Sequence, residues 1–208
     1  MRLTVIGATG RTGRHVVDEA LRRGHKVTAF TRRPESLTDR SRLAGVVQGD
    51  GRDPKAVRKA VDGADAVIAI VAAASRKGPH QCAEVMRVVT REMARARVRR
   101  LVVTSAYPIV GDRPRLPLAI LRLVFKDAYA DAATMERELR ETSLDWTIAR
   151  LNRLIDKPPQ GPLQVSTVLL DHPRPMTRAD TAAALLDIVA DPGFARRAVN
   201  LSGPAPKR

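Results

Sequence analysis

The chain has 208 residues, and its hydrophobic content of 44% is ordinary for a globular protein with one sizeable core. Its only cysteine, Cys82, excludes an internal disulfide and a cysteine-based metal cluster, and the four histidines are too scattered to suggest a metal site. No run of about 18 apolar residues could cross a bilayer, and no secretory segment precedes the first apolar stretch. We therefore expect a cytoplasmic protein without a membrane partner.

The formal net charge of +15 raises the question of a nucleic-acid partner. The positive residues are spread along the chain and mixed with 22 acidic residues, and aromatic residues that could stack on bases make up only 3%. The composition therefore argues against nucleic-acid binding. A general bias towards arginine and a small polyanionic ligand would explain the charge equally well.

The first predicted strand, at residues 3–6, leads directly into a glycine turn and then into a predicted helix at 13–23. In this turn Gly7 would permit a tight exit from the strand, and Gly10 would let the backbone approach a pyrophosphate. Gly13 would let the helix pack closely on the sheet. The helix start would offer free N–H groups to the phosphates of a dinucleotide. The alternative is a structural turn without a ligand.

The second predicted strand, at residues 26–31, ends in Thr31-Arg32-Arg33. A protein that binds NAD usually has a carboxylate here for the ribose hydroxyls. A guanidinium can instead bind the extra 2′-phosphate of NADP(H), so Arg32 and Arg33 favour NADP(H) as the cofactor. The alternative is that both are ordinary solvated surface arginines.

The third predicted strand, at residues 45–48, leads to Asp50 and to a helix at 54–62. That helix begins at Asp53-Pro54, which places a capping carboxylate before a proline at the first helical position. Asp50 could accept a hydrogen bond from the adenine amino group, or it could be a second helix cap. The pattern then predicts a strand at 66–71 and a helix at 80–96.

The fifth predicted strand, at residues 100–105, brings Ser105 and Tyr107 to the edge of the sheet where ligands bind. Both are candidate donors to a substrate oxygen. Alternatively, Ser105 caps local backbone and Tyr107 lines the pocket. The proline-containing stretch at 106–126 is predicted to be irregular, and it could be a substrate lid, an apolar segment that completes the core, or a dimer contact.

The last part of the chain completes the alternation of strands and helices. The remaining predicted elements are a helix at 127–142, strands at 145–150 and 164–169, and a helix at 178–190. Thr177 and Asp180 have the spacing of a capping box, while Asp127, Asp131 and Glu136 are expected on a solvated helix face. The whole pattern predicts one α/β domain at 1–203, a doubly wound Rossmann-like domain with a mostly parallel sheet, and a frayed tail at 204–208.

The chain resembles the atypical short-chain dehydrogenase/reductases, in particular the NmrA-like branch that includes flavin reductase/biliverdin reductase B. The resemblance covers nearly the whole length. It rests on the segment 5–13, Thr31-Arg32, Gly49-Asp50, the segments 65–68 and 102–106, the segment 135–148, and Arg178-Ala-Asp180.

The resemblance implies a role for each candidate site residue. Thr9, Gly10, Arg11, Thr12 and Gly13 would hold the pyrophosphate, and Arg32 the 2′-phosphate. Around the rest of the cofactor, the implied contacts are Asp50 and Gly51 with the adenine, Val71 and Ala72 with the adenosine ribose, Ser105 with the nicotinamide, and the backbone of Arg150, Leu151 and Asn152 with the carboxamide. A flavin or quinone-like ring stacked on the nicotinamide would be the acceptor.

The sequence also departs from the wider family. Many short-chain dehydrogenases use a Tyr-x-x-x-Lys pair for proton transfer. Here Tyr107 is followed four residues later by Gly111, and Tyr129 by Ala133. Ala132 stands where relatives often carry a lysine or histidine, and Arg150-Leu-Asn stands where they often read Arg-Pro-Gly. The usual proton donor is missing, which argues against carbonyl reduction.

These observations favour an oxidoreductase without the Tyr-x-x-x-Lys pair. The leading hypothesis is an NADPH-dependent reductase that transfers hydride to a flavin, a quinone or a related conjugated small molecule, with the proton taken from solvent. The main alternative is a non-catalytic, NADP(H)-sensing regulatory protein of the NmrA-like kind. A weaker alternative is a carbonyl or epimerase-type enzyme that uses Tyr107. We expect a monomer or homodimer.

Overall fold

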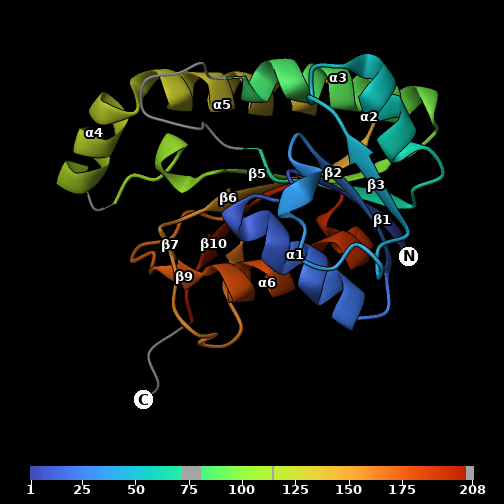
Figure 1. Ribbon diagram of the computed structural model, residues 1–208. Coiled ribbons are helices and arrows are strands. Elements are labelled where there is room, and N and C mark those ends of the chain that lie inside the picture. Colours follow the sequence, from blue (N-terminus) through green and yellow to red (C-terminus); the bar gives the residue numbers. More distant parts are fainter. Residues whose placement is uncertain (72–80, 114, 205–208) are drawn as a thin grey trace.

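A mostly parallel sheet forms the centre of the computed structural model, which describes residues 1–71, 81–113 and 115–204 (Figure 1). Within these residues the sheet has eight strands. In sheet order they are β3 (Gly45–Gln48), β2 (Lys26–Thr31), β1 (Arg2–Ile6), β4 (Ala66–Ala69), β5 (Arg100–Ala106), β6 (Asp145–Leu151), β10 (Arg197–Ser202) and β8 (Gln164–Ser166). Only β8 runs antiparallel to its neighbour. A separate parallel pair is formed by β7 (Leu154–Ile155) and β9 (Met176–Thr177).

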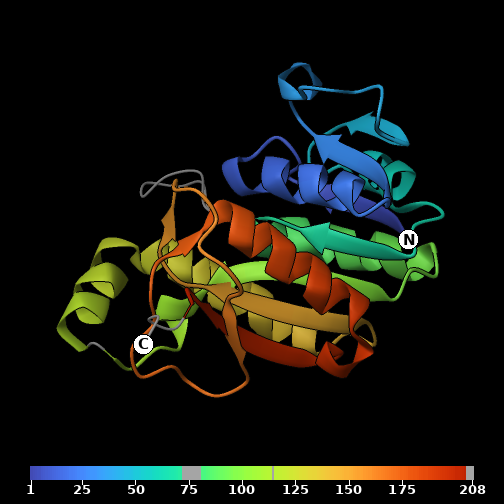
Figure 2. The same cartoon turned by 90° about the horizontal axis from the view of Figure 1, so that it is seen from below.

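Helices cover both faces of the sheet (Figure 1). One face carries α1 (Arg11–Arg22) and α6 (Arg178–Ala190), and the other carries α2 (Pro54–Val61), α3 (Cys82–Arg95) and α5 (Lys126–Arg140). A further helix, α4 (Arg115–Val124), lies at one end of the molecule in Figures 1 and 2. Short 3₁₀ turns are η1 (Pro34–Ser36), η2 (Tyr107–Ile109) and η3 (Pro192–Phe194). In the described part of the chain, no helix is both long and apolar enough to cross a membrane.

The strands β1, β4, β5 and β6 are almost entirely buried, which explains their apolar sequences. Successive side chains of a strand point to opposite faces, so Val102 packs with α1 and α6 while Val103 packs with α2, α3 and α5. Both side chains are fully buried. The predicted fold class, a single doubly wound α/β domain, is confirmed.

The predicted helices lie close to their predicted positions. Thr177 caps α6 by accepting the N–H of Asp180, as the capping box indicated, and Asp53 caps α2 by accepting the N–H of Lys55. The start of the helix expected at 80–96 lies partly outside the described residues, and so does most of the expected tail.

Three expectations about elements were wrong. The stretch 106–126 contains a regular helix, α4, because Pro117 lies in its first turn, where the N–H groups need no helical partner. The strand expected at 164–169 ends at Ser166. The strand β10, which lies between β6 and the edge strand β8, was not predicted, because its polar residues interrupt the apolar pattern. Two of them are buried and bind neighbouring backbone: Asn200 donates to Val168 and Ser202 accepts from Arg174.

Candidate functional site

The candidate site residues lie at one edge of the sheet, where the parallel strands have their carboxyl ends. Gly7 follows β1, Arg32 and Arg33 follow β2, and Asp50 follows β3. Farther along the edge lie Val71, Ser105 and Arg150, the last two being register partners on β5 and β6. Ala72 lies outside the described residues. The fold therefore brings together residues that are far apart in the sequence.

The glycine turn after β1 is constrained by backbone on two sides. Gly7 has a φ of +81°, and a Cβ there would lie 2.5 Å from the carbonyl oxygen of Ile70. A Cβ on Gly13 would overlap the carbonyl oxygen of Gly7. Gly7 therefore lets the turn pass close to the backbone after β4, and Gly13 lets α1 approach the end of β1.

The start of α1 is open to an anion. Its N-cap is Gly10, which provides no side-chain hydrogen bond, and its first turn contains no acidic residue. The helices α2 and α6 differ, because a side chain accepts an N–H at each of their starts. The hydroxyls of Thr9 and Thr31 are 2.6 Å apart and hold the turn against the end of β2. The free N–H groups and the positive end of the helix dipole are suited to phosphate.

Positive side chains lie beside this turn. Arg32 and Arg33 are exposed, and neither is in an ion pair within residues 1–71, 81–113 and 115–204. Asp50 accepts hydrogen bonds from the side chain and the backbone of Arg52, and with a smaller contribution from Arg32 these lower its pKa to about 2. Asp50 is therefore ionised at neutral pH, and Arg52 already occupies part of its acceptor capacity.

Asp156, which lies near the start of α1, was not among the residues predicted from the sequence. Its carboxylate is 2.5 Å from the guanidinium of Arg178, the first residue of α6, and 4.0 Å from that of Arg11. The side chain of Arg178 is buried, and in the described structure its Nε has no partner. Asp156 follows β7, in a loop without a periodic pattern, so no sequence signal could have identified it.

A buried ionic cluster lies at the ends of β5 and β6. Ser105 donates its hydroxyl hydrogen to Oε1 of Glu136 at 2.7 Å. Arg150 donates from Nε to Oε1 of Glu136 at 3.0 Å and from Nη2 to Oε2 at 2.5 Å, and Arg140 donates to Oε2 at 3.2 Å. Glu136 and Arg150 are both buried. While this bond lasts, Ser105 can offer a ligand only its lone pairs.

Of the three acidic residues expected on a solvated face of α5, Asp127 is exposed, but the expectation was wrong for Asp131 and Glu136. Glu136 is next to the buried positions Met135 and Leu139. Asp131 accepts the N–H groups of Cys82 and Ala83 and so caps the start of α3. The helical spacing of the apolar residues could have placed Glu136 on the inner face, since an acidic residue among buried positions needs a partner.

Two other candidate residues bind backbone. Tyr107 is fully buried, and its hydroxyl donates to the carbonyl of Leu170 at 2.8 Å and accepts the N–H of the same residue at 3.1 Å. The hydroxyl of Tyr107 therefore holds the backbone of Leu170 and has no free proton for a substrate. Asn152 donates to the carbonyl of Arg174 at 3.0 Å. Leu151 ends β6 and pairs with Leu201 of β10, so only part of this backbone is open to a ligand.

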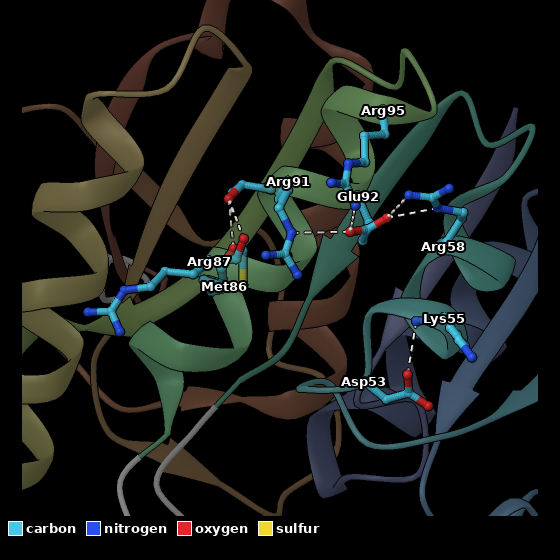
Figure 3. Close-up of polar contacts among 9 residues, drawn as sticks. Asp53, Lys55, Arg58, Met86, Arg87, Arg91, Glu92 and Arg95 are labelled. Carbon is cyan, nitrogen blue, oxygen red and sulfur yellow. Dashed lines mark hydrogen bonds and ion pairs between the residues drawn. The ribbon is translucent and has the colours of Figure 1, made fainter.

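A cavity of about 530 Å³ lies away from this edge, against α2 and α3. Its lining includes Glu92, whose side chain is fully buried and accepts hydrogen bonds from Arg58, Arg91 and Arg95 (Figure 3). The bond from Arg58 is the largest of the effects that lower the pKa of Glu92. Arg58 thereby joins α2 to α3, whereas Arg91 and Arg95 bind Glu92 within α3.

The only cysteine is unsuited to nucleophilic chemistry. Burial, together with the charge of Asp131, raises the pKa of the Cys82 thiol to about 12, so it stays protonated at neutral pH.

Comparison with known proteins identifies the family of this chain and relatives that match part of it. The model of a family described as NAD(P)H-binding matches residues 7–192. Sterol demethylase protein B from Methylococcus capsulatus (strain ATCC 33009 / NCIMB 11132 / Bath) is 38% identical over 124 residues, which are 55% of this chain and 37% of that protein. The match therefore spans little more than a third of that relative's length.

Solved structures have the same fold at low identity. A short-chain dehydrogenase/reductase from Veillonella parvula DSM 2008 in complex with NADP has a TM-score of 0.81 and 21% identity, with coverage of 98% of this chain and 95% of that chain. A protein from Streptococcus pneumoniae TIGR4 that is assigned as an NADH-flavin reductase has a TM-score of 0.79 and 21% identity, with coverage of 98% and 100%. These similarities show the Rossmann-like fold.

Proposed function

Because this chain belongs to the NAD(P)H-binding family, we propose that it is an NADPH-dependent reductase that transfers hydride to a flavin, a quinone or a related conjugated small molecule. The observation that carries the proposal is the open start of α1 beside two arginines that are free of ion pairs in the described structure. The NADP-bound structure from Veillonella parvula and the NADH-flavin reductase assignment of the Streptococcus pneumoniae protein are in keeping with it.

The residues present fit NADPH. The N–H groups of Arg11, Thr12 and Gly13 would hold the pyrophosphate, because no side chain caps them. Arg32 and Arg33 would bind the 2′-phosphate through charge-assisted hydrogen bonds. The ends of β5 and β6 would orient the nicotinamide, which supplies the hydride, while this chain provides position and exclusion of water.

The proposed class of acceptor follows from the hydroxyl groups at the end of β5, whose protons are already engaged in hydrogen bonds. The proton of Ser105 is held by Glu136, and that of Tyr107 by Leu170. An acceptor that needs a proton from a side chain, such as a ketone, would find no free donor among these residues. A flavin or quinone takes a hydride from the cofactor and a proton from water, so it needs none.

The test is the consumption of NADPH by the purified chain in the presence of FMN or of a soluble quinone, with a ketone as the comparison acceptor. We expect steady consumption with at least one of the first two acceptors and none with the ketone. Consumption with the ketone alone would contradict the proposed acceptor class.

A non-catalytic, NADP(H)-sensing regulatory protein is the second candidate. It is favoured by the same lack of a free side-chain proton at the end of β5. The two candidates differ in turnover. Binding of NADPH with no consumption in the presence of any of the three acceptors would support the regulatory function and contradict the reductase.

A further inference from the structure

The outer face of α4 exposes a stripe of apolar side chains. Leu116, Ile120 and Leu123 are spaced four and three residues apart, and 73%, 54% and 78% of their surfaces are exposed. The opposite face holds the helix in place, since Leu118 is buried and Arg122 donates to the carbonyls of Pro108 and Gly111. Single exposed apolar residues are common on soluble proteins, but a contiguous apolar stripe indicates a binding surface.

A second exposed apolar segment leads to residues that contact the chain just before α4. Val168 is 70% exposed and Leu169 is 44% exposed. The hydroxyl of Tyr107 binds Leu170, and Asp171 is 3.6 Å from Arg113, so this segment is held beside the residues that precede α4. In Figures 1 and 2, α4 lies at the outer end of the molecule, so a flat partner could reach its outer face.

The charges around the stripe favour one occupant. Arg115 at the start of α4 and Lys126 just after its end are exposed and are in no ion pair in the described part of the chain. Arg113 pairs with Asp171 and Arg122 faces the protein, while Asp112 and Asp127 are the nearest acidic residues in the sequence. An apolar helix face with a cation at each end, on a chain whose net charge is +15, suits the interface of a membrane with anionic lipids. A second copy of the chain would bring two molecules with a net charge of +15 and the same cations together, which opposes self-association.

We propose that α4, with Val168 and Leu169, docks the protein on the surface of an anionic phospholipid bilayer without crossing it. This differs from the expectation, drawn from the sequence, that the chain has no membrane partner. Because η2 directly joins β5 to the segment that leads into α4, docking would bring the bilayer near the candidate site. The inference does not depend on the proposed function, and either can fail without the other.

The test is co-sedimentation of the full chain with vesicles of phosphatidylcholine alone or of phosphatidylcholine with phosphatidylglycerol. We expect binding to the anionic vesicles that falls as salt is raised, because salt screens the cations. Leu116→Ser/Leu123→Ser should weaken it at least tenfold, since two exposed apolar side chains no longer enter the interface. Unchanged melting temperature and NADPH binding would show that this variant is folded.

A charge-matched pair of variants keeps the test decisive if the serine variant does not fold. Arg115→Glu/Lys126→Glu should abolish binding to the anionic vesicles, whereas Arg40→Glu/Arg42→Glu, which changes the net charge equally in an exposed loop, should leave most of it. Three results would overturn the proposal: no binding to either vesicle, equal loss in both charge variants, or a solution homodimer that the leucine substitutions dissociate.

Discussion

At the scale of single residues, the choice of cofactor depends on two side chains at the end of β2. Arg32→Ala should weaken NADPH binding by about 1.5–3 kcal/mol, roughly tenfold to a hundredfold, because a charge-assisted hydrogen bond to the 2′-phosphate is lost. The dissociation constant for NADH should change little. Arg42→Ala, an exposed arginine in the loop between β2 and β3, is the control. Equal losses of affinity for NADPH and NADH would contradict the assignment of Arg32.

The cluster at Glu136 gives a prediction about stability. Glu136→Gln removes the charge that Arg140 and Arg150 face inside the protein, so the free energy of unfolding should fall by about 3 kcal/mol. Denaturant unfolding measures the change. Glu141→Gln, an exposed position just after α5, should leave the stability unchanged. A stable Glu136→Gln variant would mean that solvent reaches the arginines and that the cluster is open.

Sequence reasoning at this scale identified residues whose chemistry is local. The glycine turn and the arginines after β2 can be recognised from residues that are neighbours in the sequence. The partners of Ser105 and Tyr107 do not, because Glu136 and Leu170 reach them only through the packing of α5 and of the segment after β8. The sequence can show that a hydroxyl lies at the end of a strand. Only the tertiary structure shows which group accepts its proton.

At the scale of elements, the contact between the glycine turn and α1 gives a sharp test. Gly13→Ala places a Cβ on the carbonyl oxygen of Gly7, so α1 must shift and the stability should fall by about 1–3 kcal/mol. NADPH affinity should fall as well, because the first turn moves. Gly45→Ala is the matched control, since its Cβ meets only Thr28, at 3.6 Å. Thermal unfolding and NADPH titration of both variants measure these effects, and equal stability of the two would contradict the close packing.

The elements that were predicted from the sequence have continuous apolar patterns, whereas polar residues or a proline interrupt the pattern of those that were missed. The strands β1, β2, β4 and β5 are apolar because helices cover both of their faces. The strand β10 is also largely buried, but it contains the polar residues Asn200 and Ser202, which form hydrogen bonds with the backbone of loops. These two residues interrupt the apolar pattern by which a buried strand is recognised. The segment of α4 was expected to be irregular because it contains Pro117. This proline lies in the first turn, where a helix tolerates one.

At the scale of the whole molecule, ion pairs make the stability depend on pH. Glu19 binds Arg22 and Arg23, and Arg23 also binds Asp187, so these residues join α1 to α6. The hydrogen bond from Arg22 is the largest cause that lowers the pKa of Glu19 from 4.5 to about 2. Because the folded pKa is the lower one, this contribution is complete above pH 4.5 and is lost as the pH falls towards 2.

The free energy of unfolding of the wild type should therefore decrease across this acidic window. Glu19→Gln should remove about 1 kcal/mol at neutral pH, because solvent screens the exposed arginine partner, and should flatten the decrease. Urea unfolding at a series of pH values measures both effects. Glu35→Gln, at an exposed position in η1, should behave as the wild type does. An unchanged pH dependence in Glu19→Gln would show that the pair contributes nothing.

The central claim is that the open start of α1, with the arginines after β2, binds an adenine dinucleotide that has an extra phosphate. Calorimetric titration of the purified chain with NADPH tests it most directly. We predict saturable binding of one NADPH per chain, tighter than that of NADH under the same conditions. No heat of binding at millimolar NADPH, with the chain shown to be folded, would contradict the claim.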